Sequence, residues 1–188
     1  MIDRRSAVAE LLTDRGDLLV VTGLGSPTYD AFAAGDDDRN FYLWGAMGAA
    51  AMVGLGLALA QPARPVLVLT GDGEMLMGLG GFATIAQHQP KNLSIVVLDN
   101  EHYSETGGQK TATGRGTDLA TVAEGCGIAG VRRISDLKDI GALRAALHFR
   151  QGPLVAVVKI APETAPRAIP IRDGVALKLR MRGAVLGG

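Results

Sequence analysis

Cysteine is nearly absent from this chain, since Cys126 is the only one among 188 residues. A single cysteine excludes a disulfide framework and a thiolate metal cluster. Cys126 lies between two glycines, which is more typical of a small buried residue than of a nucleophile. An excess of one charge is lacking as well, because 19 acidic residues balance 19 basic residues. The composition therefore gives no indication of nucleic acid or an anionic membrane as a partner.

Long apolar runs are also missing. The longest, residues 45–60, is rich in small residues and too short to span a bilayer. Residues 1–5 lead into a segment with helical spacing of apolar residues and not into the apolar core of a signal peptide. We therefore expect a cytoplasmic protein. Its length is that of one domain with a sizeable core.

Short runs of β-branched and aliphatic residues alternate with segments of helical spacing. Such runs are typical of strands that are buried on both faces. Strands are expected at residues 18–21, 66–69, 93–98, 131–134 and 153–160, and helices at 4–13, 27–32, 45–59, 74–87, 118–124 and 136–149. This alternation predicts an α/β fold, a three-layer α/β/α sandwich with a mainly parallel sheet. We expect this domain to cover residues 1–161. Three prolines and a basic segment then favour an extended C-terminal arm over residues 162–188.

Polar residues follow two of the expected strands at their carboxyl ends. Gly71-Asp72-Gly73 follows the strand at 66–69, and Asn100 follows the strand at 93–98. Ligands of such βαβ units bind at these ends. The glycines let backbone N–H groups approach a phosphate, and a helix that begins at Glu74 adds its positive end. Asp72, expected at an exposed strand tip, and Asn100 offer oxygen ligands that suit Mg²⁺.

The first strand ends in Thr22-Gly23-Leu24-Gly25-Ser26. This glycine-bearing tip is a second candidate phosphate contact, through Thr22, Gly23, Gly25 and the Ser26 hydroxyl. The pair Gly23 and Gly25 invites comparison with a dinucleotide-binding motif, but Thr28 stands where the third glycine belongs. A non-catalytic scaffold like a nucleotide-binding domain remains an alternative.

Gly71-Asp72-Gly73 followed by Asn100 resembles the signature of thiamine-diphosphate enzymes. The resemblance implies thiamine diphosphate and Mg²⁺ as cofactors, with Asp72, Asn100 and the backbone carbonyl of His102 as metal ligands. The family has an Asn-Asn pair where this chain has Asp99-Asn100. The replaced residue is not a metal ligand, so the departure leaves every ligand position filled.

Gly45-Ala46-Met47-Gly48 resembles a second stretch of that family. The resemblance implies that Met47 props thiamine into its V-shaped conformation, in which the 4′-amino group approaches C2 of the thiazolium. The carbonyl of Gly45 would accept a hydrogen bond from that amino group. Met47 would in this way serve catalysis, although a methionine at this spacing is also ordinary core filler.

The loop after Asn100 is polar and contains glycines, as a substrate-facing lid would. His102 or Glu105 there could move protons, and Ser104 is a further candidate contact to the cofactor. A hydrated loop in which only the His102 carbonyl matters is the alternative. Many thiamine decarboxylases have a catalytic Glu one position further along, so Glu105 departs from their spacing by one residue.

The run 98–102, with Thr106-Gly107-Gly108-Gln109 soon after, looks like phosphonopyruvate decarboxylase and the β subunit of sulfopyruvate decarboxylase. This likeness implies a 2-oxo acid that loses CO₂ and leaves as an aldehyde, with the thiazolium as electron sink. Gln109, Lys110 and Arg115 are candidates to meet a sulfonate or phosphonate. A subunit of a 2-oxo acid oxidoreductase or of an acetolactate-synthase-like enzyme is the alternative within the family.

One element that the family requires is missing. The Glu that activates the aminopyrimidine ring comes from a separate pyrimidine-binding domain, for which these 188 residues leave no room. The resemblance therefore implies an α subunit that carries this Glu, most simply in an α₂β₂ assembly. The chain alone, even as a homodimer, is expected to be inactive.

Overall fold

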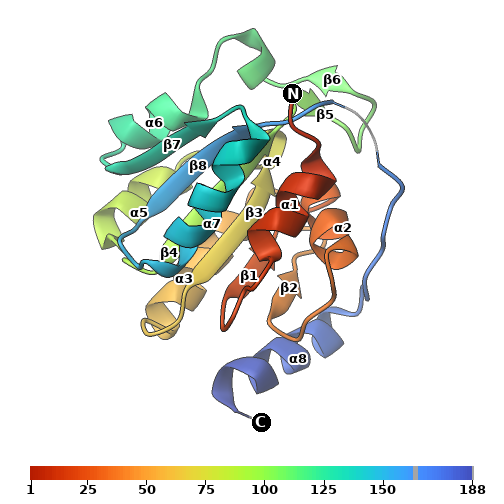
Figure 1. Cartoon of the computed structure of the whole chain (residues 1–188), viewed down its shortest axis with the longest axis vertical. Coiled ribbons are helices and arrows are strands. Elements are labelled where there is room, and N and C mark those ends of the chain that lie inside the picture. Colours follow the sequence, from red (N-terminus) through yellow and green to blue (C-terminus); the bar gives the residue numbers. More distant parts are fainter. Residues whose placement is uncertain (163–164, 188) are drawn as a thin grey trace.

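The structure is a computed structural model in which residues 1–162 and 165–187 are described. Its centre is a six-stranded sheet in which every neighbouring pair is parallel, in the order β2-β1-β3-β4-β8-β7 (Figure 1). The strands are β1 (Leu19–Thr22), β2 (Asn40–Tyr42), β3 (Val66–Gly71), β4 (Leu93–Asp99), β7 (Gly130–Ile134) and β8 (Leu154–Lys159). A separate antiparallel pair consists of β5 (His102–Tyr103) and β6 (Gln109–Lys110).

Helices cover both faces of this sheet, which confirms the three-layer α/β/α sandwich. One face packs against α1 (Arg4–Leu12), α2 (Ser26–Ala33) and α7 (Ile140–His148). The other packs against α3 (Ala50–Ala60), α4 (Asp72–Met77), α5 (Gly81–His88) and α6 (Leu119–Gly125). Short 3₁₀ turns are η1 (Thr113–Arg115) and η2 (Leu137–Asp139).

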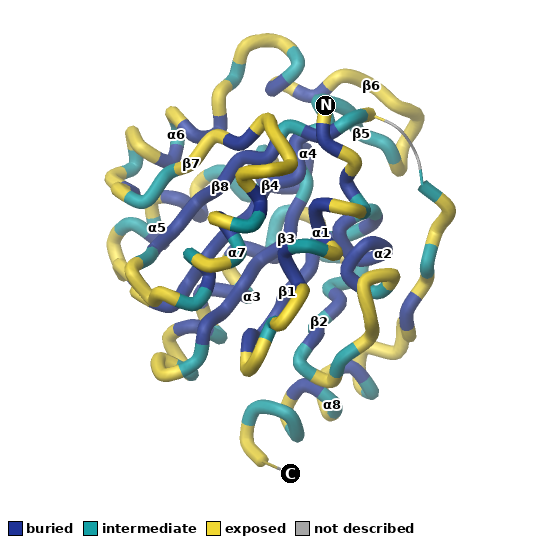
Figure 2. Tube along the Cα trace, viewed as in Figure 1, coloured by how far each residue is buried: buried dark blue, intermediate teal, exposed yellow. Residues whose placement is uncertain are grey.

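The central strands β3 and β4 are buried along their length except at Gly71, the half-buried last residue of β3 (Figure 2). Leu67 and Leu69 of β3 point into the core beneath α1, whereas Val66 and Val68 point into the core beneath α3. Both sides of a strand in a doubly covered parallel sheet must be apolar, which is why the runs of Val, Leu and Ile predict these strands. Because all six strands run parallel, their carboxyl ends lie at one edge of the sheet.

The expected helix at 74–87 is wrong as a single element, because it divides into α4 and α5. Gly78 ends α4 at a point where the backbones approach closely. A Cβ atom on Gly78 would lie 2.1 Å from the carbonyl oxygen of Gly48. The break therefore lets the loop before α3 pack directly on the end of α4.

The expected extended arm is only partly correct. Residues 165–173 form no helix or strand, but α8 (Gly174–Leu186) follows and lies beside β2. Asp173 caps this helix, since its carboxylate accepts hydrogen bonds from the backbone N–H groups of Val175 and Ala176. Leu177 and Met181 anchor the helix in the two cores. Residues 163–164 and 188 lie outside the described residues, and the boundary at 161 stays a prediction.

Within the described ranges, no helix has the length and apolar character needed to cross a membrane.

Candidate functional site

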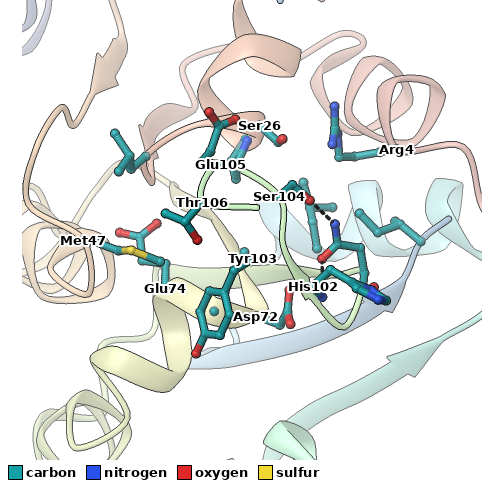
Figure 3. Close-up of a pocket in the computed structure, with 17 residues that line it drawn as sticks. Arg4, Ser26, Met47, Asp72, Glu74, His102, Tyr103, Ser104, Glu105 and Thr106 are labelled. Carbon is teal, nitrogen blue, oxygen red and sulfur yellow. Dashed lines mark hydrogen bonds between the residues drawn. The ribbon is translucent and has the colours of Figure 1, made fainter. Parts of the chain in front are cut away.

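A pocket opens at the carboxyl ends of β3 and β4, where the sequence predicts a site (Figure 3). It brings together ten of the predicted site residues, namely Ser26, Met47, Gly71, Asp72, Gly73, Glu74, Asn100, His102, Ser104 and Glu105. Further lining comes from Arg4, Leu24, Pro27, Leu98, Tyr103, Thr106 and Ile160. Four predicted residues do not line it: Thr22, Gly23, Gly25 and Gly45. The predicted anion contacts Gln109, Lys110 and Arg115 are exposed and lie outside the lining.

Asp72 is buried, with 2 % of the residue exposed, so the expectation of an exposed strand tip is wrong. Its Oδ2 accepts hydrogen bonds from the hydroxyls of Thr111, at 2.6 Å, and Thr113, at 3.1 Å. Burial raises the pKa of Asp72 above its ordinary value, and the Thr111 hydroxyl acts against that rise. Both hydroxyls donate to Oδ2. Among the described residues, no side chain donates a hydrogen bond to Oδ1.

A second buried carboxylate lies behind the first. Asp99, at the end of β4, accepts a hydrogen bond of 2.8 Å from Thr113 and pairs with Lys159 Nζ at 2.7 Å. Lys159 also pairs with Glu101 at 2.8 Å. Thr113 Oγ1 therefore lies between Asp72 and Asp99 and shares its single proton between them, with the shorter distance to Asp99, and Lys159 pairs with the Asp99 carboxylate. Sequence reasoning missed Thr111, Thr113 and Lys159, because no local motif marks them.

We predict that Thr113→Val weakens Mg²⁺-dependent binding of thiamine diphosphate about 10-fold, since residues that orient a metal ligand have effects of this order. The free energy of unfolding should fall by about 1–3 kcal/mol, because buried carboxylate oxygens lose a donor. Calorimetric titration and urea unfolding measure the two effects. Thr13→Val is the control, as Thr13 is exposed and its hydroxyl donates within its own helix. Equal cofactor affinities for both variants would contradict the bridging role.

Asn100 is held by a local turn. Its Oδ1 accepts a hydrogen bond from the backbone N–H of His102 at 3.0 Å, and its Nδ2 donates to Ser104 Oγ at 2.8 Å. The ring Nδ1 of His102 lies 2.8 Å from the carbonyl oxygen of Asn100. When Nδ1 carries the proton it donates to this carbonyl, which leaves Nε2 as the unprotonated nitrogen of a neutral ring.

Two threonine hydroxyls form hydrogen bonds at the glycine-bearing tip after β1. Thr22 and Thr28 share a hydrogen bond of 2.5 Å, and Thr28 donates to the carbonyl of Gly23. A Cβ atom on Gly23 would lie 1.5 Å from Oε2 of Glu74, so a side chain at this position would displace the Glu74 carboxylate. Gly25 has φ +79°, and a Cβ atom there would lie 2.8 Å from Cγ of Glu105.

Glu74 is a buried carboxyl group at the base of the pocket, with 4 % of the residue exposed. Its Oε2 accepts a hydrogen bond of 3.0 Å from Thr70. Burial raises the pKa of Glu74, opposed by the Thr70 hydroxyl and by nearby backbone N–H groups of Ala50, Gly48 and Leu24. Those N–H groups are close, yet Oε1 has no hydrogen-bond partner of normal geometry within the described chain. The carboxylate thus lies beside the N-terminal end of α3, where the N-cap residue Ala49 makes no side-chain hydrogen bond.

Met47 is in the loop before α3, and 37 % of the residue is exposed. The glycines on either side allow this loop to turn, since Gly45 has φ +72° and Gly48 has φ +93°. A methionine that is core filler would be buried, whereas Met47 points into the pocket (Figure 3).

The donor set fits a hard cation. Within the described residues no three His, Cys, Asp or Glu side chains are placed to hold a metal ion. Mg²⁺ does not require such a cage, since it binds through one or two carboxylates and completes its shell with phosphate oxygens and water. The free Oδ1 of Asp72, the amide of Asn100 and backbone carbonyls at one pocket supply this chemistry.

Comparison with known proteins agrees with this geometry. Residues 29–159 match the family described as thiamine pyrophosphate enzyme, C-terminal TPP binding domain. The chain belongs to the thiamine pyrophosphate enzymes. Its fold matches benzoylformate decarboxylase from Polynucleobacter necessarius with a TM-score of 0.69 at 26 % sequence identity, over 87 % of this chain and 34 % of that chain.

Two relatives of this TPP-binding domain differ in length. Sulfopyruvate decarboxylase subunit beta from Methanothermobacter thermautotrophicus is 40 % identical over 92 % of this chain and 89 % of its own length. Phosphonopyruvate decarboxylase from Streptomyces viridochromogenes is 41 % identical over 85 % of this chain, which spans only 40 % of that protein.

Proposed function

We propose that this chain is the diphosphate- and Mg²⁺-binding subunit of a thiamine-diphosphate-dependent 2-oxo acid decarboxylase. Its substrate is a 2-oxo acid that bears a sulfonate or phosphonate, as in sulfopyruvate or phosphonopyruvate. The observation that carries the proposal is the meeting of Asp72 and Asn100 at one pocket. The likeness to sulfopyruvate decarboxylase subunit beta over 89 % of its length supports the choice of reaction.

Each predicted residue has a part in the proposal. Asp72, Asn100 and the His102 carbonyl hold Mg²⁺, Met47 supports the thiamine, and the Gly45 carbonyl accepts from its amino group. The proposed cofactor contacts are Thr22, Gly23, Gly25, Gly45, Met47, Gly71, Asp72, Gly73, Glu74, Asn100 and Ser104. When bound, thiamine diphosphate supplies the electron sink for loss of CO₂. His102 and Glu105 lie where a proton can be passed to the product, within the same pocket.

The proposal includes a partner subunit that carries the activating Glu. Three carboxylates line the pocket, and the proposal gives each of them another part. Asp72 would hold Mg²⁺, Glu74 is a proposed cofactor contact buried at the pocket base, and Glu105 pairs with Arg167. The acid that activates the aminopyrimidine is therefore assigned to the partner.

An exposed apolar patch supports the position of that partner. Met47, Met52 and Met77 are 37 %, 39 % and 61 % exposed. Met47 precedes Gly48 and Met77 precedes Gly78, the two glycines whose backbones meet, and Met52 lies next to Gly81. Exposed apolar patches beside a site mark interaction surfaces. We place the partner here, most simply in an α₂β₂ assembly with cofactors between the subunits.

The reaction class is tested on the chain co-expressed with its partner and supplied with thiamine diphosphate and Mg²⁺. Sulfopyruvate, phosphonopyruvate and pyruvate are offered, and CO₂ and aldehyde are measured. We expect equal amounts of both products, fastest from an anionic 2-oxo acid. Turnover that requires coenzyme A and an electron acceptor would identify a 2-oxo acid oxidoreductase instead.

A further inference from the structure

Three arginines and two carboxylates form ion pairs beside the pocket, and two of these residues, Arg4 and Glu105, line it. This ion-pair cluster consists of Arg4, Arg5, Arg167, Asp30 and Glu105. The fully buried Asp30 accepts hydrogen bonds from both Arg4 and Arg5, the latter at 3.3 Å. Arg167 Nη2 pairs with Glu105 Oε2 at 3.0 Å. Three positive charges face two negative ones, so the ion-pair cluster carries one positive charge in excess.

Arg167 is the member that can reach a ligand. Arg4 and Asp30 are buried with each other, whereas 60 % of the Arg167 side chain is exposed. Its guanidinium lies 5.8 Å from the centre of the Tyr29 ring. Its partner Glu105 lines the pocket on the same side as Ser26 and Arg4 (Figure 3). Arg167 is not itself part of the lining, but it lies beside a lining residue, and among the described residues its side-chain hydrogen bond goes to Glu105 alone.

The segment that carries Arg167 is fixed at both ends. Arg5 Nη2 donates to the carbonyl of Pro166 at 2.7 Å, and Trp44 Nε1 donates to the carbonyl of Ile171 at 3.1 Å. Arg172 lies over the Trp44 ring, 5.3 Å from its centre. In Figure 1 this C-terminal segment runs along α2 toward α8. Arg167 therefore belongs to an irregular segment that hydrogen bonds hold on both sides of it.

We propose that Arg167 binds the anionic group at the far end of the 2-oxo acid, a sulfonate or phosphonate. The proposal rests on the proposed function and names the residue that selects its substrate class. The planar guanidinium matches the oxygen geometry of such groups and can bind two oxygens at once. Glu105 holds Arg167 at the pocket in the absence of substrate. Because an exposed ion pair contributes little, Arg167 turns toward the ligand at small cost.

The test compares Arg167→Gln with the native protein, both assembled with the partner and loaded with cofactor and Mg²⁺. We expect KM for sulfopyruvate and phosphonopyruvate to rise about 10- to 100-fold, the range for a hydrogen bond to a charged group. The kcat for these acids and both constants for pyruvate should change little, because pyruvate has no distal anion. Arg167→Lys should restore part of the affinity, since it keeps the charge but loses the planar fork.

Arg172→Gln is the matched control. Arg172 is an arginine of the same segment that lies over the Trp44 ring and not over Tyr29, so its replacement should leave every constant unchanged. Calorimetric binding of sulfoacetate, with acetate as reference, gives a readout that needs no turnover. Weaker sulfoacetate binding in Arg167→Gln would support the anion site whether or not a substrate is decarboxylated. Absence of decarboxylation, with sulfoacetate binding still dependent on Arg167, would refute the proposed function and leave this inference standing. Unchanged KM and unchanged sulfoacetate binding in Arg167→Gln would overturn the inference, as would an equal rise of KM for pyruvate.

Discussion

Replacing Asp72 by asparagine should lower the Mg²⁺-dependent affinity for thiamine diphosphate by more than about 100-fold. Residues that merely orient a metal ligand cost 10- to 100-fold, and Asp72 is proposed as the ligand itself. Asparagine keeps the shape and an oxygen for the hydroxyls of Thr111 and Thr113. The fold should survive, because burial already disfavours the charge that is removed. Calorimetric titration of the assembled protein with the cofactor measures the effect.

The control for this prediction is Asp136→Asn. Asp136 is half exposed, its contacts are local to η2, and it lies outside the pocket. Its variant should bind the cofactor as the native protein does. Thermal unfolding of the metal-free proteins should show that neither variant is unfolded. Native cofactor affinity in Asp72→Asn would remove Asp72 from the metal site.

Replacing Met47 by alanine should slow turnover on the order of 100-fold while the cofactor still binds. The proposed diphosphate and metal contacts are other residues of the pocket, so the anchor end of the cofactor should be unaffected. Without the methionine the thiamine can relax from its bent conformation, and a small misplacement of a reacting atom costs about this much in rate. Met47 is partly exposed, so the substitution leaves no sealed cavity in the core.

Steady-state kinetics at saturating cofactor measures this loss of kcat, and titration measures the affinity. Leu59→Ala is the comparison, since Leu59 is 48 % exposed on α3 and lies outside both the pocket and the methionine patch. Equal kcat values for the native protein and Met47→Ala, with weaker cofactor binding, would reduce Met47 to a packing residue.

The strands of the sheet were predictable because burial on both faces leaves only aliphatic residues. Val66 and Val68 face one core, and Leu67 and Leu69 face the other. The edge strand β2 was missed, because it is only three residues long, follows an acidic turn and holds just the first two residues of the apolar run 41–44. The helix α8 had a usable signal in Asp173, its N-cap, which the nearby prolines obscured.

The candidate site was predictable only where its chemistry is local in sequence. Gly71-Asp72-Gly73 and Asn100 mark the ends of two adjacent strands, so their approach follows from the topology. The burial of Asp72 does not, because Thr111 and Thr113 arrive from a distant loop. The pairing of Glu105 with Arg167 also depends on the path of the C-terminal segment along α2. No spacing rule connects such residues.

The proposed dependence on a partner rests on the roles that the proposal gives to the pocket residues. Asp72 would hold the metal, Glu74 lies buried at the base and Glu105 pairs with Arg167, and exposed methionines lie nearby. An incomplete site of this kind should bind the anchor end of the cofactor but lack the acid that activates it.

The most direct measurement is the decarboxylation rate of the purified chain alone, compared with the same chain after its partner is added. Both samples contain thiamine diphosphate, Mg²⁺ and saturating sulfopyruvate or phosphonopyruvate. The account predicts no turnover above background for the chain alone and turnover that rises with added partner to a plateau at equimolar subunits. Turnover by the chain alone at the rate of the assembled protein would contradict it.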